Sequence, residues 1–300
     1  MNRKQKPLVV ITGAAGSIGK SLADELKHDY RVVGLDLVTK GTDFECFECD
    51  ITSDESVELA LSRLREGYGD HVAALVHLAA YFDFTGEEKP AYKIVNEDGA
   101  QRLLRAFQDL QVDQIVYSST MLVHEPVEPG ELIDESNPVG PTWAYPQSKA
   151  RTEEIVLAER GGAKVTLLRL AGLYDRETSV PTLSHQIARI YDRDIKSHLY
   201  SGDTRAGQAF IHRDDMLDLF HRTIDRRAQL PETCVILGGE NRVVSYEELQ
   251  KSIGSLIHGE DEWATIAVPA PVAKAGAWIE EKSEPIVPDD FDYGEKPFIR

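Results

Sequence analysis

Cysteine is scarce in this 300-residue chain, and its placement argues against both a disulfide framework and a metal site. The three cysteines are an odd number, and only Cys46 and Cys49 lie close together in the sequence. That pair falls in a strand-like stretch, where residues three apart point to opposite faces, and no second Cys or His pair at zinc spacing follows it. We therefore predict buried or incidental thiols, a reducing compartment and no bound metal.

Long hydrophobic runs are also missing, since none approaches the roughly 18 residues that a membrane span needs. The opening MNRKQKPLVVITG passes directly into a strand-like run without the small-residue pattern of a cleavage site. We expect a cytoplasmic protein with no membrane partner. Positive charge is in short supply as well, because 33 basic residues face 51 acidic ones, a formal net charge of −18. Such a chain repels phosphate backbones, so we expect no nucleic-acid partner.

What the sequence does contain is a regular alternation of strand-like and helical segments. Apolar residues recur at helical spacing from Val57 to Leu64 and from Ala100 to Phe107, and Thr52 with Glu55 resembles a capping box ahead of the first helix. Near-continuous apolar strands separated by helices predict an α/β fold with a doubly wound parallel sheet of the Rossmann type. The predicted strands are 8–12, 31–35, 44–49, 72–79, 114–119 and 164–170.

The most informative stretch is VVITGAAGSIGKSLADEL, which joins the first predicted strand to a helix. Gly13 permits the tight turn, Gly16 lets the backbone approach a pyrophosphate, and Gly19 lets the helix pack on the strand. The helix N-terminus then offers N–H groups and a positive dipole end to the phosphates. We predict a dinucleotide site that includes the loop residues Gly13, Ala15, Gly16, Ser17, Ile18 and Gly19.

Asp36 ends the second predicted strand, where dinucleotide folds place the carboxylate that binds the adenosine ribose. A carboxylate at this position accepts hydrogen bonds from both ribose hydroxyls and repels a 2′-phosphate, and no arginine follows directly. We therefore predict NAD rather than NADP as the cofactor. The alternative, that Asp36 only caps a strand, agrees less well with the glycine loop upstream.

The regular alternation weakens after residue 171, which predicts a second, smaller unit. We assign 1–171 to an NAD-binding Rossmann domain, to which 206–245 returns with a helix and a strand. Residues 172–205 and 246–300 are predicted to form a small C-terminal substrate lobe.

The segment AYPQSKA places Tyr145 and Lys149 four residues apart, which puts both on one face of a helix. Pro146 between them fits only if the helix begins near residues 143–145, because elsewhere it removes a backbone bond and clashes. The tyrosine is therefore expected at the helix entrance, with the lysine one turn further in. Alone, this spacing is weak evidence, since many surface helices carry it by chance.

The glycine loop and the Tyr145/Lys149 pair together resemble the extended short-chain dehydrogenase/reductase superfamily, specifically the NAD-dependent epimerase/dehydratase family, over most of the chain. TGAAGSIG is similar to that family's TGxxGxxG loop, and the pair is similar to its YxxxK motif. The resemblance implies that Thr120, in YSSTMLVHE, stands at the catalytic Ser/Thr position. It also implies further cofactor contacts in the matching segments CDI, HLAA, VNEDGAQRLL and YSSTMLVHE, namely Asp50, Ile51, Leu78, Ala79, Ala80, Asn96 and Ser118.

The resemblance implies a catalytic set of Thr120, Tyr145 and Lys149, in which Tyr145 and Lys149 also contact NAD. Tyr145 takes the hydroxyl proton, and because a free phenol titrates near pH 10, the nearby ammonium and nicotinamide charges must favour the phenolate. Lys149 also holds the ribose hydroxyls, and Thr120 donates a hydrogen bond to the reacting oxygen. Packing or positioning, rather than catalysis, is expected of His77, His124 and His212.

Two departures from the family pattern bear on the substrate. Gln208 stands where sugar-nucleotide members carry an arginine for the diphosphate, and Ala171 and Gly172 stand where such enzymes often have an asparagine. Arg205 or Arg213 could compensate, although we expect both on solvated surface. The family's closing LGW-P element is absent, so either the chain is a piece of a longer protein or its substrate lobe is unusually short.

Three functions remain open. The first is an NAD-dependent epimerase/dehydratase-type oxidoreductase that acts on a sugar, a sugar nucleotide or a related hydroxy compound. The second is a simple NAD-dependent dehydrogenase or reductase of a small carbonyl or hydroxy compound, which the missing arginine favours. The third is a non-catalytic NAD-sensing binding protein, which need not have retained the catalytic set. By analogy with the superfamily, helices near 96–110 and 143–160 would form the interface of a homodimer.

Overall fold

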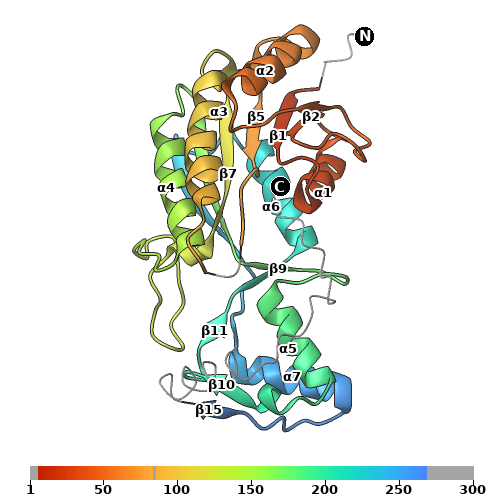
Figure 1. Cartoon of the computed structure of the whole chain (residues 1–300), viewed down its shortest axis with the longest axis vertical. Helices are drawn as coiled ribbons and strands as arrows, with labels where there is room; N and C mark the ends of the chain where they lie inside the picture. The colour runs from red at the N-terminus through yellow and green to blue at the C-terminus, as the bar shows by residue number, and fades with distance from the viewer. Residues whose placement is uncertain (1–5, 84–85, 269–300) are drawn as a thin grey trace.

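A sheet of seven parallel strands forms the centre of the protein, in the order β13-β8-β7-β5-β1-β2-β3 (Figure 1). The computed structural model describes residues 6–83 and 86–268. The α/β class and the doubly wound parallel sheet predicted from the sequence are confirmed. The strands are β1 (Leu8–Thr12), β2 (Arg31–Asp36), β3 (Cys46–Glu48), β5 (Ala74–His77), β7 (Gln114–Thr120), β8 (Lys164–Leu170) and β13 (Thr233–Gly238).

Helices cover both faces of this sheet and create two hydrophobic cores (Figure 1). A strand that is buried on both faces must be apolar at nearly every position, which is why all five residues of β1, LVVIT, are buried. One face is covered by α2 (Asp54–Tyr68), α3 (Ala100–Phe107) and α4 (Ala144–Ala158). The other is covered by α1 (Ser17–Leu26) and α6 (Arg213–Asp225).

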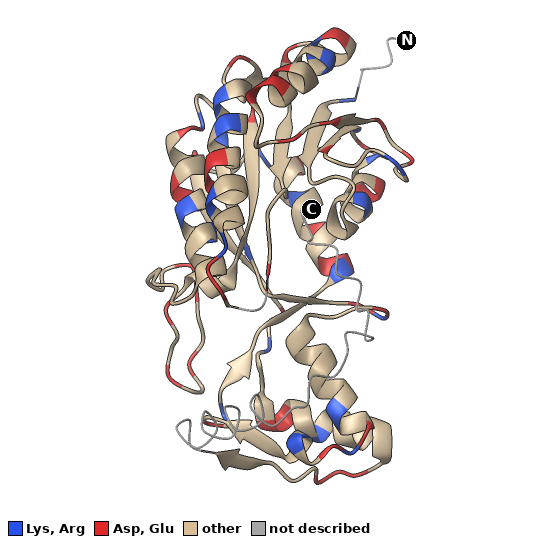
Figure 2. Ribbon diagram, in the orientation of Figure 1, with Lys and Arg blue, Asp and Glu red and all other residues tan. Residues whose placement is uncertain are grey.

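Charged residues of both signs lie along the outer sides of α3 and α4, whereas the central strands carry very few (Figure 2). This is the distribution expected of helices that are amphipathic and of a sheet that is buried. Among the residues that the structure describes, no helix combines the length and the apolar character needed to span a membrane.

The start of α2 differs by one residue from the predicted cap. Asp50 Oδ1 accepts hydrogen bonds from both the N–H (2.8 Å) and the hydroxyl (2.7 Å) of Thr52, so this threonine is not available to the helix. Ser53 is the N-cap instead, and its hydroxyl accepts the Ser56 N–H at 3.3 Å. The predicted capping box of Thr52 with Glu55 is therefore wrong, because a local aspartate competes for the threonine.

The start of α4 confirms the prediction made from its proline. Trp143 is the N-cap with extended backbone, and Ala144 is the first helical residue. Pro146 thus lies in the first turn, where its missing N–H would have had no helical partner in any case. Tyr145 is the second residue of the helix, and Lys149 follows one turn later.

The chain after residue 171 builds a smaller unit below the sheet (Figure 1). Its helices α5 (Pro181–Tyr191) and α7 (Tyr246–His258) enclose a small core around the buried Trp263. Segment 206–245 returns to the main sheet with α6 and β13, although the predicted domain boundaries themselves stay a prediction. Residues 269–300 of the predicted lobe lie outside the described residues.

Short elements complete the topology. The two-stranded pairs are β9 (Gly172–Tyr174) with β12 (Phe210–His212), β10 (Leu199–Ser201) with β15 (Ile266–Val268), β11 (Gly207–Gln208) with β14 (Val244–Ser245), and β4 (His71–Val72) with β6 (Gln111–Val112). The short helices are the π-helix η1 (Tyr92–Gly99) and the 3-10 helices η2 (Met121–Val123) and η3 (Ile195–His198).

Helix α1 approaches the glycine loop so closely at Gly19 that no side chain fits between them. A Cβ built at Gly19 would lie 2.3 Å from the carbonyl oxygen of Gly13 and 2.6 Å from the Cα of Ala14. Both are backbone atoms and cannot swing aside. This contact fixes the N-terminus of α1 beside the loop that follows β1.

We expect Gly19→Ala to lower the free energy of unfolding by about 1 to 3 kcal/mol, the usual effect of overpacking, in urea titrations. The matched control is Gly67→Ala in α2, where a Cβ would meet nothing within 4 Å. That variant should be as stable as the wild type or more stable, because alanine favours a helix over glycine by about 0.8 to 1 kcal/mol. Equal losses in both variants would contradict the close approach at Gly19.

Candidate active site

The carboxyl ends of β1, β2, β5 and β7 meet at one edge of the sheet, and the predicted site residues lie there. Gly13 follows β1 with φ +69°, and its N–H donates to the carbonyl of Leu35 at 2.9 Å. A Cβ at Gly13 would lie 2.9 Å from the backbone nitrogen of Ala79, just after β5. The glycine thus lets the backbones that follow β1, β2 and β5 come together.

The N-terminus of α1 opens directly onto this loop. Its N-cap is Gly16, no side chain caps it, and its first turn holds no acidic residue. Ser17 is exposed, Ile18 is half-buried and Gly19 is buried. Uncapped helix N–H groups beside backbone that tolerates no side chain suit the pyrophosphate of a dinucleotide. The residues present therefore fit NAD.

Asp36 is a structural acceptor as well as a candidate ribose ligand. Its Oδ2 accepts the Ala15 N–H at 2.9 Å, and its Oδ1 accepts the Val38 N–H at 3.0 Å. The residue is buried. Each carboxylate oxygen can accept a second hydrogen bond, so these contacts leave acceptor capacity for ribose hydroxyls. The sequence reasoning had set capping and ribose binding against each other, whereas the geometry allows both.

The other predicted cofactor contacts organise the loops around the site. Asp50 shapes the turn before α2, and the Ile51 side chain lies 3.0 Å from where a Cβ of Gly99 would be. Asn96 lies in η1, is buried, and holds the segment after β5 in place. Its Oδ1 accepts the Tyr81 N–H at 2.6 Å, and its Nδ2 donates to Tyr81 O (3.0 Å) and to Ser148 Oγ (2.9 Å).

Leu78, Ala79 and Ala80 follow β5 and are half-buried. The Thr12 hydroxyl oxygen accepts the N–H groups of Leu78 and Ala79, each at 3.2 Å, so its own proton is available to His77 Nδ1 at 2.7 Å. His77 is therefore the neutral tautomer with its proton on Nε2. Burial and the charge of Lys149 lower the pKa of His77 to about 3. As expected, this histidine positions a segment and does not exchange protons at neutral pH.

Thr120, Tyr145 and Lys149 come from two elements that pack on each other, β7 and α4. Thr120 ends β7, and its hydroxyl oxygen accepts the Leu122 N–H at 3.3 Å. Lys149 Nζ lies 4.4 Å from the centre of the Tyr117 ring. Ser118, one residue before the buried Ser119, is half-buried on β7. Strand alternation directs these two serines to opposite faces of the sheet.

Aromatic rings surround the phenol of Tyr145. The ring centres of Phe82, Trp143 and Tyr92 lie 4.5, 5.8 and 6.4 Å from it. Burial, and the neighbouring Tyr92, raise the pKa of Tyr145 well above its ordinary value. Burial also lowers the pKa of Lys149 to about 7, an effect that the carboxylate of Glu153 opposes. The phenol therefore needs added positive charge nearby before it can give up its proton.

The comparisons with known proteins agree with this arrangement. The model of the NAD dependent epimerase/dehydratase family matches residues 9–236, about three quarters of the chain. The chain belongs to this family. The predicted enzyme class, an NAD-dependent epimerase/dehydratase or dehydrogenase of the extended short-chain dehydrogenase/reductase type, and the cofactor NAD are thereby confirmed.

Individual relatives are distant. A GDP-6-deoxy-D-talose 4-dehydrogenase of Aggregatibacter actinomycetemcomitans is 24% identical over 73% of this chain and 70% of its own length. A UDP-glucose 4-epimerase of Thermotoga maritima, solved with UDP-glucose, is 22% identical with a TM-score of 0.66, over 87% and 86% of the two chains. A short-chain dehydrogenase/reductase superfamily protein of Agrobacterium tumefaciens with bound NAD has a TM-score of 0.69 at 20% identity, over 92% and 100%. These structures share the fold.

Within this family fold, the arginines considered as substitutes for Gln208 already have acidic partners. Arg205 is exposed, and its Nη2 lies 2.6 Å from Asp203 Oδ2. Arg213 Nε lies 2.7 Å from Asp175 Oδ2 with both side chains largely covered, so the expectation that it lies on solvated surface is wrong. Gln208 itself pairs with the Thr182 hydroxyl at 3.3 Å.

The sequence reasoning missed a buried polar cluster next to the predicted catalytic residues, formed by Ser119, His124, Glu153 and Arg169. Its members come from β7, the segment after η2, α4 and β8. Two signals were present in the sequence. Glu153 follows Lys149 by four residues, and Arg169 interrupts the otherwise apolar strand KVTLLRL.

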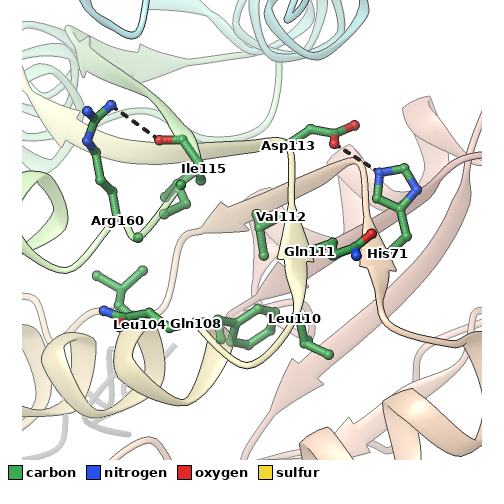
Figure 3. Close-up of a pocket in the computed structure, with 13 residues that line it drawn as sticks. His71, Leu104, Gln108, Leu110, Gln111, Val112, Asp113, Ile115 and Arg160 are labelled. Carbon is green, nitrogen blue, oxygen red and sulfur yellow. Dashed lines mark hydrogen bonds and ion pairs between the residues drawn. The ribbon is translucent and has the colours of Figure 1, made fainter.

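A separate cavity of about 210 Å³ lies at the opposite edge of the sheet, near the amino ends of β7 and β8 (Figure 3). His71 Nε2 and Asp113 Oδ1 pair across it at 2.9 Å, and Arg160 donates to the carbonyl of Ala163 at 3.4 Å. Because Thr120 and the glycine loop lie at the other edge, this cavity is separate from the candidate active site.

The first prediction for the site concerns cofactor choice. We expect the wild type to bind NAD(H) more tightly than NADP(H) in fluorescence titrations. Asp36→Ala should lower the ratio of the NADP(H) to the NAD(H) dissociation constant by about tenfold or more, since a charge-assisted hydrogen bond contributes roughly 1.5 to 3 kcal/mol. Asp36→Asn removes the charge and keeps one of the two acceptors, for the Ala15 N–H but not for the Val38 N–H, so it should narrow the preference as well while disturbing the loop less than alanine does. Tighter NADP(H) binding by the wild type would refute the assignment of Asp36.

Proposed function

We propose that this enzyme transfers hydride between NAD and the carbinol carbon of a hydroxy compound, with Thr120, Tyr145 and Lys149 as its catalytic set. The observation that carries the proposal is where these three side chains lie in the fold. Thr120 ends β7, and the helix with Tyr145 and Lys149 packs along that strand, two strands away from β1 and its glycine loop. Groups suited to proton transfer therefore lie beside a dinucleotide cradle.

The chemistry follows from the properties of these side chains. NAD, when bound, supplies the hydride acceptor and a positively charged ring. Tyr145 takes the hydroxyl proton of the substrate at its phenol oxygen. Burial keeps this phenol protonated in the free enzyme, and we assign to the ammonium form of Lys149 and to the nicotinamide the positive charge that favours the phenolate. Because the Thr120 oxygen already accepts the Leu122 N–H, its proton is directed to another acceptor, the reacting oxygen.

For the substrate we propose a compound without a nucleotide diphosphate, or one that holds it in a different way from sugar-nucleotide members of the family. Gln208 offers a neutral amide where a bidentate, charged guanidinium is expected. Arg205 and Arg213 are each engaged by an aspartate. Two of the relatives act, by their names, on GDP- and UDP-linked sugars. We therefore propose that the chain keeps the catalytic residues of the family but lacks its arginine for the substrate's diphosphate.

We further propose a homodimer formed through α3 and α4, and a cytoplasmic location. The first is supported by apolar Ile94 and Leu157, which are exposed on η1 and α4. The second is supported by three cysteines that are all free thiols. Burial raises the pKa of Cys46 to about 11, so this thiol stays protonated. Sedimentation analysis and cell fractionation test the two proposals separately.

The proton-transfer role predicts that Tyr145→Phe lowers turnover by about 10² to 10⁴-fold, the usual contribution of general acid–base catalysis. Affinity for NAD should stay within a few-fold, because the ring remains. Steady-state kinetics and NADH fluorescence measure the two quantities.

The matched control for this variant is Tyr92→Phe, which removes a hydroxyl from a ring 6.4 Å from that of Tyr145. The Tyr92 hydroxyl donates to the carbonyl of Asp83 at 2.9 Å and has no part in the proposed proton transfer, so we expect this variant to keep turnover close to the wild-type value. Near-full activity of Tyr145→Phe on an established substrate would rule out the mechanism. A wild type that binds NAD but turns over no substrate in any panel would favour the NAD-sensing alternative.

The substrate proposal predicts turnover of free sugars, sugar acids or small hydroxy compounds in a panel that also contains UDP-, GDP- and dTDP-sugars. Accumulation of NADH would identify a dehydrogenase, whereas product without net NADH would identify an epimerase or dehydratase. Gln208→Arg should strengthen inhibition by a nucleoside diphosphate about tenfold if this position faces the substrate, as expected for one charged hydrogen bond. Micromolar saturation of the wild type by a nucleotide sugar, with turnover, would restore the ordinary epimerase assignment.

A further inference from the structure

Glu153 and Arg169 form a buried ion pair at the centre of the polar cluster. Their side chains are 6% and 7% exposed. Arg169 Nε donates to Glu153 Oε1 at 3.0 Å and Nη2 donates to Oε2 at 2.7 Å, which is a bidentate pairing. The Ser119 hydroxyl donates to the same Oε1 at 2.5 Å. The carboxylate therefore has a partner on both oxygens, as a buried charge requires.

The third guanidinium nitrogen extends the cluster to the loop after η2. Arg169 Nη1 lies 3.1 Å from His124 Nε2, and since arginine can only donate, that nitrogen is the acceptor. His124 then carries its proton on Nδ1, which donates to the carbonyl of Asn137 at 3.1 Å. Burial and the charge of Arg169 lower the pKa of His124 and keep it neutral. The cluster is thus a chain of satisfied hydrogen bonds from α4 to a loop carbonyl.

Three members of the cluster, Ser119, Glu153 and Arg169, lie close to the proposed catalytic residues in the fold. Ser119 directly precedes Thr120 on β7, and Arg169 is its register partner on β8. Glu153 lies one helical turn after Lys149, on the same face of α4. The pairing of Glu153 with Ser119 and Arg169 therefore sets how α4 lies against the end of β7. That relation decides where Tyr145 and Lys149 lie with respect to Thr120.

We propose that Glu153 is a positioning residue of this active site, which aligns α4 with the end of β7 and presents a fixed negative charge to Lys149. The inference rests on the proposed function of Lys149 and Thr120. An ion pair elsewhere in α4 would also align this helix with β7. The negative charge of Glu153 matters in addition because this residue lies one turn after Lys149.

Among the described residues, Glu153 is the acidic side chain that acts on Lys149. Lys149 interacts with Glu153 on its own helix, with the ring of Tyr117 on β7 and with neutral His77 on β5. Of these groups, Glu153 is the one that raises the pKa of Lys149 against the effect of burial. Its neutralisation should therefore make Lys149 lose its proton at lower pH.

The test follows the titration of Lys149 directly, by NMR of protein with ¹³C-labelled lysine, with the signal assigned by its loss in Lys149→Arg. In Glu153→Gln we expect the midpoint to fall by about one pH unit, the usual effect of removing a nearby opposite charge. NADH affinity at pH 8 should fall several-fold, because less of the lysine is ammonium. The matched control is Glu154→Gln, the same change on an exposed neighbour, which should leave the midpoint and the affinity unchanged.

Two further variants separate charge from stability. Glu153→Gln leaves Arg169 without a counter-charge and will lower the melting temperature, whereas the double variant Glu153→Gln with Arg169→Gln removes both charges and should recover it. The Lys149 midpoint should return to the wild-type value in Glu153→Asp, which keeps the carboxylate. If the midpoint is the same in the wild type and in Glu153→Gln, Glu153 is only structural and the proposal is overturned. None of these readouts needs a substrate, so they remain interpretable if the proposed reaction is wrong.

Discussion

Parallel pairing of neighbouring strands is the constraint on which the rest of this structure depends. Because each connection must cross back over a face of the sheet, every strand starts at the same edge and ends at the other. The ends of β1, β2, β5 and β7 consequently form a continuous line. Residues as far apart in the chain as Gly13, Asp36, Ala79 and Thr120 become neighbours for that reason alone. The helices that cover the sheet then determine which side chains lie beside these strand ends.

Two contacts hold α1 and α4 in place at that edge of the sheet. One depends on the absence of a side chain and the other on charged and polar side chains. At Gly19 the absence of a side chain brings α1 against the loop, so backbone N–H groups become available. At Glu153 an ion pair and a serine hydrogen bond join α4 to β7 and β8. The first contact tolerates no added atom, whereas the second requires every polar group to keep its partner. The glycine loop and the proposed proton-transfer site thus lie on one sheet, the first held by a steric restraint and the second by an electrostatic one.

Local patterns carried most of what could be predicted from the sequence. The five buried residues of β1, the glycine loop and the start of α4 at Pro146 are each decided within a few residues. Sequence reasoning failed where a distant or competing group decides. The Ser53 cap depends on Asp50 taking Thr52, and the burial of Arg213 depends on Asp175. The two- and three-residue strands after residue 171 are too short to show an alternating pattern, and their partners lie far along the chain, as in the pairing of β10 with β15.

The burial of Lys149 has a consequence for the stability of the whole fold. Its pKa falls from 10.5 to about 7 on folding, so between these values the unfolded chain binds more protons than the native one. Because folded Lys149 loses its proton first, the free energy of unfolding rises as the pH increases from about 7 to 10.5. Below that window there is no such gain. At 1.36 kcal/mol for each unit of pKa, a charged Lys149 opposes folding by roughly 4 to 5 kcal/mol. The fold thus carries its own destabilising charge at neutral and acidic pH, and a ligand that binds the ammonium form makes the protein more resistant to acid.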